Sequence, residues 1–291
     1  MRQHDTTPKD FSKSNGWVIL DDLESGIKTK IELAGIPLKD WNIQINYGIK
    51  TGYNDAFIID GKKREELINK CPKADEIIRP ILKGRDIKKY RAEFEDRWVI
   101  FTRRGIDIEQ YPAVKEYLFQ HYDLLKPRED NDTSGRKPGS YKWYEIQDNV
   151  AYFDDFNMEK IIWIELSDAP KFSYDDEKYF VEATAFIMTG PHLKYLTAFL
   201  NSRLCDWYFD KITTTSGVGT NRWKKIYIEH LPIPEIPPEN EKRFDEIIDA
   251  TFNALDRNED ISELDTDINT MVLDLYQFDQ EEKDLLLGFR N

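Results

Sequence analysis

The sequence predicts a mixed α/β (α+β) body over residues 1–234 and an acidic helical appendage over residues 235–291. Short apolar runs that are typical of strands alternate with helical patterns throughout the first part. The prolines of Leu231–Pro234 and Pro237–Pro238 then interrupt regular structure. With 291 residues, of which 40% are hydrophobic, the chain is large enough to bury a sizeable core.

The first half of the body begins with a well-delimited helix. Asp21 or Asp22 is a suitable N-cap, and Gly35 and Pro37 mark an end near Ala34. A turn-rich segment over residues 48–54 then separates two β-prone runs. The other elements expected in this half are strands at 42–45, 56–60 and 97–102 and helices at 62–70 and 112–125.

The second half of the body contains two apolar runs, at 160–166 and 183–189, that predict buried strands. A helix is expected over 192–208, because Leu196 and Phe199 belong to one apolar face at helical spacing. The remaining expectations are a Thr/Ser/Gly-rich loop at 213–220, a strand at 225–228, appendage helices at 239–255 and 262–276, and a third short helix from Gln280.

Composition and motifs exclude several classes of protein. No run approaches the roughly 20 apolar residues of a membrane helix, and the polar Met1–Asp10 segment lacks the apolar centre of a secretory signal. Cys71 and Cys205 are too few for a disulfide framework or a metal cluster, and the four histidines show no metal-ligand spacing. We therefore expect a soluble cytoplasmic protein without membrane contact.

The formal net charge of −14 is unevenly distributed. Residues 235–291 hold 5 bases and 17 acids (5 − 17 = −12), whereas the body holds 36 bases and 38 acids (36 − 38 = −2). Positive charge collects in residues 79–104, 133–144 and 211–225, and the last two stretches contain no acid. Such stretches could supply the local positive field of a phosphate-binding surface, although scattered solvated charge is the alternative.

Two acid-x-Lys strings are compatible with a metal-dependent nuclease, in which carboxylates hold a divalent metal and a lysine supports the attacking water. They are Asp86-Ile87-Lys88 and Asp176-Glu177-Lys178, the latter with Asp155 as an upstream acid. In a chain with 33% charged residues such strings arise readily by chance. Catalysis therefore has little support from the sequence.

Several separated strings of residues together resemble one known family. In order they are Gly48–Asp60, Arg79–Tyr90, Trp143–Glu145, Lys160–Trp163, Phe199–Ser202, Leu231–Pro234, Asp267–Asn269 and Leu273–Tyr276. The series is similar to the TaqI-like C-terminal specificity domain of type IIG restriction-modification enzymes and related adenine-specific DNA methyltransferases. It extends from about Trp17 to the end of the chain.

The resemblance implies a target-recognition domain that is not an enzyme on its own. In that family a separate methyltransferase domain carries the S-adenosylmethionine site and an Asn-Pro-Pro-Tyr type motif. Pro237-Pro238, flanked by Ile236 and Glu239, does not match that motif. The implied partners are double-stranded DNA and a methyltransferase domain. No cofactor or metal is expected in this chain, while S-adenosylmethionine, and magnesium where a nuclease is attached, would belong to the catalytic domains. The chain would be an excised C-terminal piece or a stand-alone specificity polypeptide.

Candidate DNA contacts are basic side chains, hydroxyl groups and flexible loops that can approach the phosphates or the edges of the nucleobases. The first group is Thr214, Ser216, Arg222, Lys224 and Lys225, with a surface linker as the alternative. The second is Arg136, Lys137, Tyr141 and Lys142 in a long loop. The third is Lys83, Arg85, Lys88, Arg103 and Arg104, where Asp86 could instead pair locally or cap a helix. Lys50, Thr51 and Asn54 complete the set, in a turn where a structural role is favoured and Gly52 should have a positive φ.

The acidic appendage offers a different function, that of a protein-interaction module such as a DNA-mimicking inhibitor. If the chain instead recognises DNA, these helices must face away from the duplex, because like charges repel. We then expect them to pack on the body or to contact the methyltransferase domain, while the basic stretches converge on the opposite side.

Overall fold

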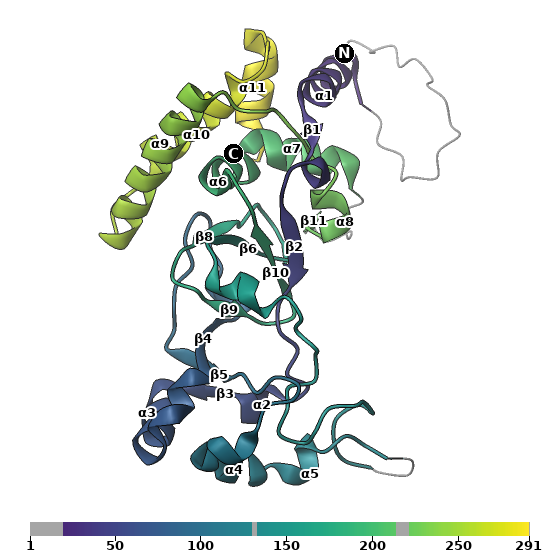
Figure 1. The fold of residues 1–291 in the computed structure, drawn as a ribbon. Helices are drawn as coiled ribbons and strands as arrows, with labels where there is room; N and C mark the ends of the chain where they lie inside the picture. Colours follow the sequence, from purple (N-terminus) through teal and green to yellow (C-terminus); the bar gives the residue numbers. More distant parts are fainter. Residues whose placement is uncertain (1–19, 130–132, 214–220, 291) are drawn as a thin grey trace.

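The computed structural model describes residues 20–129, 133–213 and 221–290, which form an elongated molecule with an upper and a lower lobe (Figure 1). Each lobe has its own four-stranded sheet. The buried apolar side chains form two clusters, and the one centred on the lower lobe also includes Ile162, Ala185 and Ile187 of the upper sheet. The mixed α/β class predicted from the sequence is confirmed. Within the described residues, no helix combines the length and the apolar character needed to cross a membrane.

The upper sheet is antiparallel, in the order β2 (Gln44–Tyr47), β10 (Ala185–Thr189), β6 (Lys160–Ile164) and β8 (Ser173–Asp175). All five residues of β10 are buried, as expected for an apolar central strand. The helices α6 (Leu193–Leu200) and α7 (Arg203–Ile212) share its core.

The lower sheet has the order β3 (Ile58–Asp60), β5 (Arg97–Ile100), β4 (Ile78–Leu82) and β9 (Phe180–Val181). Only the β4–β9 pair is parallel among these strands. The lobe also contains the helices α2 (Asn54–Phe57), α3 (Gly61–Lys70), α4 (Pro112–Phe119) and α5 (Tyr122–Leu125). Because β9 lies between β8 and β10 in the sequence, the two lobes are connected by several crossings of the chain.

The first helix, α1 (Asp22–Ala34), has a capping box formed by Asp21 and Glu24. It leads into β1 (Ile36–Pro37), which pairs antiparallel with β12 (Pro232–Ile233). The proline-rich segment expected to be irregular therefore contains a short strand, and Pro is tolerated there because each strand of this two-stranded sheet is an edge.

The acidic segment folds into α9 (Pro238–Asp256), α10 (Ser262–Leu273) and α11 (Gln280–Gly288). Its apolar face is buried in the core of the upper lobe, where the rings of Phe244 and Tyr195 lie 5.1 Å apart. The buried core residues of these helices include Phe244, Ile248, Ile268, Val272 and Leu286. Amphipathic spacing thus leaves most of the acids on the outer surface, while Glu282 is buried and pairs with Lys30.

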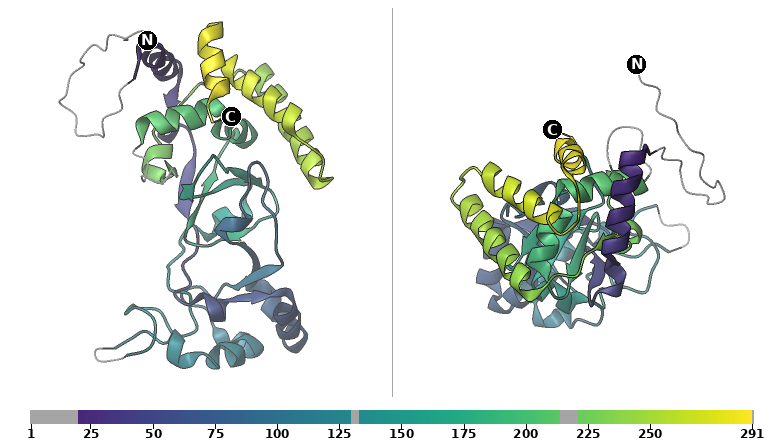
Figure 2. Two further views of the ribbon diagram at one scale, coloured as in Figure 1. Left: turned by 180° about the vertical axis from the view of Figure 1, so that it is seen from behind. Right: turned by 90° about the horizontal axis from the view of Figure 1, so that it is seen from above.

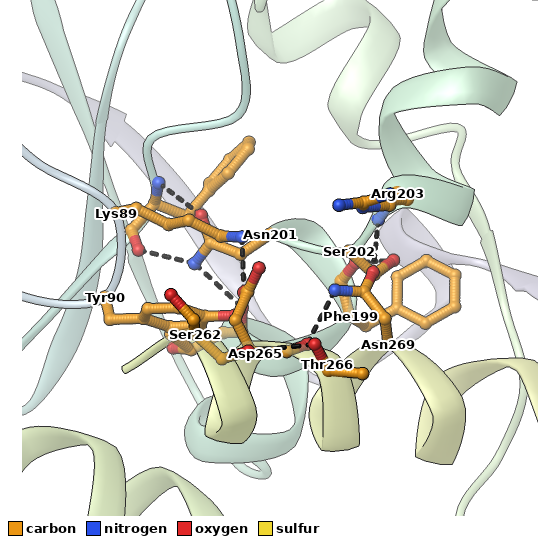
Figure 3. A network of polar contacts seen from close by, with 12 residues as sticks. Lys89, Tyr90, Phe199, Asn201, Ser202, Arg203, Ser262, Asp265, Thr266 and Asn269 are labelled. Carbon is orange, nitrogen blue, oxygen red and sulfur yellow. Dashed lines mark hydrogen bonds and ion pairs between the residues drawn. The ribbon is translucent and has the colours of Figure 1, made fainter. Parts of the chain in front are cut away.

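A polar network joins α10 to the body (Figure 3). Asp265 accepts hydrogen bonds from the ammonium of Lys89 and the hydroxyl of Tyr90. Asn269 accepts the backbone N–H of Arg203 at 2.7 Å, at the start of α7. Asn201, which is 2% exposed, bonds both the N–H and the carbonyl of Phe172. The strings that contain Asn201 and Asn269 therefore have a structural role in this chain.

Some expected elements differ from the observed ones. The segment expected as a strand at 225–228 is the helical turn α8 (Lys225–Ile228), in which Ile228 is buried and Ile226 is 57% exposed. The expected helix at 112–125 divides into α4 and α5, and that at 192–208 divides into α6 and α7 at Asn201 and Ser202. The expected strand at 56–60 begins as α2, and β6 is followed by the separate strand β7 (Leu166–Ser167).

Lys160 and Asp175 form a fully buried ion pair between β6 and β8, with side chains that are 0% and 1% exposed. The Lys160 ammonium also donates to the carbonyls of Phe156 at 2.8 Å and Met158 at 3.2 Å. Burial lowers the pKa of Lys160 and raises that of Asp175, so each charge needs its partner.

We predict that Lys160→Met lowers the free energy of unfolding by about 3–5 kcal/mol, because it leaves the Asp175 charge buried without its cation. Urea unfolding followed by tryptophan fluorescence measures the change. The double variant Lys160→Met/Asp175→Asn removes both charges and should regain part of the loss. A double variant no more stable than the single one contradicts this assignment.

Candidate nucleic-acid interface

The upper end of the candidate interface is built around Trp223, which follows the strand β11 (Asn221–Arg222). Trp223 is 1% exposed and stacks on Phe209 with ring centroids 3.9 Å apart. Its carbonyl accepts a hydrogen bond of 2.8 Å from the indole of Trp163. Since successive side chains of extended backbone point to opposite sides, burial of Trp223 directs Arg222 and Lys224 toward solvent.

Arg222 and Lys224 keep most of their hydrogen-bonding capacity. Their side chains are 50% and 39% exposed, and each lies 3.8 Å from the same oxygen of Glu165. This distance is at the outer limit of an ion pair, and such exposed pairs contribute little stability. Both cations are therefore available to a further anion.

Lys225 has a different role from its neighbours. Its ammonium donates at 2.9 Å to the carbonyl of Ile45 in the edge strand β2. It lines a shallow cleft of about 340 Å³ together with Lys39 and Glu229. Lys225 thus satisfies a strand edge while remaining partly accessible.

The middle of the interface is the turn Gly84–Asp86 after β4. Asp86 is 3% exposed and accepts the backbone N–H of Lys83 at 2.7 Å and a hydrogen bond from Arg97. The structural role considered for Asp86 is therefore confirmed. In contrast to the buried Asp86, the Arg85 side chain is 72% exposed, and its guanidinium lies 3.8 Å from the Asp86 carboxylate.

Arg136 is the interior support of the 133–144 loop and is 3% exposed. Its guanidinium donates five hydrogen bonds of 2.6–3.2 Å, which use all of its N–H groups. The acceptors are the carbonyl oxygens of Leu125, Thr51, Glu145, Lys142 and Trp143. Burial lowers the pKa of Arg136 to about 10. The structure therefore contradicts the prediction that Arg136 contacts DNA.

Thr51 and Tyr141 are also interior residues, against the prediction of direct contacts. Thr51 is 1% exposed and donates to the side-chain oxygen of Asn54 at 2.6 Å. Tyr141 is 4% exposed, and its hydroxyl donates to the carbonyl of Lys137. Gly52 has the predicted positive φ, at +85°. The turn and the loop are thus fixed from inside.

Arg103 and Arg104 stabilise the neighbouring segment. The Arg103 guanidinium lies 3.4 Å from the ring centroid of Phe153, a cation–π contact. Arg104 donates to the carbonyl of Gln147 at 2.9 Å and lies 3.5 Å from the carboxylate of Glu145. Both side chains are half-buried, and their guanidinium groups are engaged in these intramolecular contacts.

A line of contacts connects Arg222 and Lys224 with Arg85. Glu165, which faces Arg222 and Lys224, donates its backbone N–H to the carbonyl of Thr184 at 3.1 Å. Gly84 packs on Thr184, since a Cβ atom placed on Gly84 would lie 3.7 Å from the Thr184 hydroxyl. Arg85 therefore leaves the surface close to the end of β6, which Glu165 follows.

The line continues to the lower lobe through Glu182. Its backbone N–H donates to the carbonyl of Leu82 at 3.2 Å, and its carboxylate accepts from Asn54 at 3.1 Å. Asn54 in turn accepts from Thr51, whose carbonyl bonds Arg136 of the long loop. We call the solvent-accessible cations along this line the basic face: Lys50, Lys83, Arg85, Lys137, Lys142, Arg222 and Lys224.

The acidic helices lie on the other side of the molecule. In Figure 1 the 133–144 loop, β11 and α8 are on the right and α9 is on the left, and the view from behind in Figure 2 shows the same separation. Lys88, like Arg103, Arg104 and Lys225, is not part of the basic face; it pairs with Glu93, and its neighbour Lys89 bonds α10. Thr214 and Ser216 lie outside the described residues.

The acid-x-Lys strings are occupied by local contacts. Asp86 bonds Arg97, Asp176 bonds Arg91 at 2.6 Å, and Asp155 accepts from Asn46 at 2.7 Å. In the ranges 20–129, 133–213 and 221–290, no three His, Cys, Asp or Glu side chains are grouped so as to hold a metal ion. Neither string is arranged as a metal-dependent nuclease site in this structure.

Comparison with known families agrees with this geometry. Residues 79–233, more than half of the chain, match the TaqI-like C-terminal specificity domain. The chain belongs to this family. The resemblance drawn from the sequence strings is thereby confirmed, and a specificity domain recognises a target rather than catalysing a reaction.

Relatives of the chain are much longer proteins. The Type II methyltransferase M.BanIII of Aneurinibacillus aneurinilyticus is 23% identical over an alignment of 260 residues, and the match covers 83% of this chain and 43% of the relative. The Type IIL restriction-modification enzyme MmeI, solved in complex with DNA, shares the fold with a TM-score of 0.51 at 14% identity. That match covers 88% of this chain and 34% of MmeI. The chain thus spans less than half the length of either protein.

Two carboxylates of the interface were not predicted from the sequence, Glu165 and Glu182. Each follows an apolar strand and lies near predicted contact residues, but no carboxylate is among the predicted contacts. A search for acids directly after the strand ends would have found both.

We predict that Arg136→Met lowers the free energy of unfolding by at least about 3 kcal/mol, because five backbone carbonyls lose their donor. The matched change Lys137→Met, at the next and exposed residue, should alter it by no more than about 0.5 kcal/mol. Equal effects in chemical denaturation would contradict the interior role of Arg136.

Proposed function

We propose that this specificity domain recognises double-stranded DNA through the basic face and selects the site for a methyltransferase partner. One observation carries the proposal: cations from separate stretches of a chain with a net charge of −14 are connected by one line of contacts, and the 133–144 loop and β11 lie on the side away from the acidic helix α9. A local positive field of this kind is what a duplex backbone requires. The family assignment supports the same function.

Within the basic face, exposed cations are suited to phosphate contacts. Arg85, Arg222 and Lys137 extend into solvent, so each can reach a phosphate without disturbing the fold. Thr214 and Ser216 remain proposed contacts. Phosphate contacts set the register of the protein on DNA, and base contacts then specify the sequence. The interior residues Thr51, Arg136 and Tyr141 act by holding these groups in place.

The proposed partner is an adenine-specific, S-adenosylmethionine-dependent methyltransferase domain, as in type IIG enzymes, with magnesium where a nuclease is attached. The relatives that are longer methyltransferases or restriction-modification enzymes support this partnership. In this chain Pro237 and Pro238 begin α9, and we assign no step of methyl transfer to them. A DNA target also supports a cytoplasmic location.

We predict that Arg222→Ala/Lys224→Ala weakens binding to every duplex and reduces the salt dependence. Loss of two phosphate contacts lowers the slope of log K against log salt concentration by about 2. Fluorescence anisotropy with a labelled duplex at a series of salt concentrations measures both quantities.

The matched control is Lys242→Ala/Arg243→Ala on α9, which removes the same charge from the acidic side, where Lys242 is 79% exposed. This control should leave the slope unchanged. If both double variants lower affinity and slope equally, binding depends on net charge, and the basic face is not the binding surface.

A further inference from the structure

Glu182 is an unusual group for a surface that binds a polyanion. It is half-buried in the basic face, and among the described residues no cation lies within 4.0 Å of its carboxylate. Lys83 and Arg85 are nevertheless near enough to influence it. Burial raises the pKa of Glu182, which means that the site does not fully compensate its charge.

The orientation of this carboxylate is fixed by a chain of hydrogen bonds. The Thr51 hydroxyl donates to Asn54 Oδ1 at 2.6 Å, so the Asn54 amide must direct its NH₂ group away from Thr51. Asn54 Nδ2 then donates to Glu182 Oε1 at 3.1 Å. Thr51 is 1% exposed and cannot turn away, whereas Asn54 is exposed. The pair is therefore positioned before any ligand arrives.

The free positions of the pair form an adjacent donor and acceptor. Asn54 retains one N–H, and Glu182 retains its second oxygen, which is a strong acceptor. The carboxylate repels a phosphate, whereas an amino group can donate a hydrogen bond to the carboxylate. In the major groove only adenine and cytosine present an exocyclic amino group, and adenine adds the N7 acceptor beside it.

We propose that Asn54 and Glu182 read a base bearing an exocyclic amino group, adenine or cytosine, in the major groove of the target. The proposal rests on the proposed function as a DNA-recognition domain and adds a specificity-determining pair to it. Glu182 is the discriminating group, and Thr51 is a positioning residue that fixes its Asn54 partner. The nearby cations Lys83 and Arg85 offset the repulsion between the carboxylate and the phosphates.

The substitution Glu182→Gln should invert the base preference at this position, from bases that bear an amino group to bases that bear a keto oxygen. Because Asn54 can only donate to this side chain, the glutamine amide introduced there would accept with its oxygen and present its NH₂ group to the base. A donor in that place selects the keto oxygens of thymine or guanine. Glu182→Ala presents neither group and should flatten the preference at the same position by about tenfold.

The experiment is selection from a randomised duplex library by the full chain, followed by sequencing of the bound DNA. Wild type should enrich a sequence with adenine or cytosine at one position, Glu182→Gln should enrich thymine or guanine there, and the other positions should stay the same. The matched control is Glu246→Gln on α9, which removes the same charge from the acidic side of the molecule and should not change the selected sequence. Thermal melting confirms that each variant is folded.

The outcomes separate this inference from the proposed function. If wild type and Glu182→Gln enrich the same sequence, or if both glutamine variants change all positions alike, the pair does not read a base and the inference is overturned. If wild type binds the library without enriching any sequence, the proposed function is itself overturned, and the inference with it.

Discussion

Burial of a neighbouring residue determines where each cation of the basic face points. Trp223 lies inside between Arg222 and Lys224, and Arg136 lies inside next to Lys137. The apolar or hydrogen-bonded neighbour fixes the backbone, so the charged side chain has little choice of direction. Ordering of the surface is thus achieved during folding rather than during binding, which reduces the entropic cost of association.

The distribution of charge follows from the same packing. The acidic helices bury their apolar faces in the core shared with α6 and α7, and this contact holds α9, with its exposed carboxylates, on the side away from β11. Charges on exposed surfaces are screened within about 8 Å at physiological salt. A net negative chain can therefore present a positive surface to DNA, and its acidic side discourages binding in other orientations.

Much of the fold could be predicted from local signals, because caps and apolar periodicity reflect local physics. Asp21 caps α1 as expected, and the apolar run at 185–189 is a buried strand. The turn at 225–228 could not be predicted, since the contact between Lys225 and Ile45 is tertiary. Charge alone likewise could not separate Arg136, which holds carbonyls inside, from Lys137, which is exposed. Only the neighbours in three dimensions distinguish a basic residue that stabilises the loop from one that is free to contact DNA.

The parallel pairing of β4 with β9 has a further implication for how such domains diversify. The lower lobe is assembled from one long segment and from a short strand that returns after β8. A transplant of the long segment alone would leave Ile81 and Leu82 without their native strand partners. Recombination between relatives must therefore exchange both pieces together or preserve the pairing of their edges.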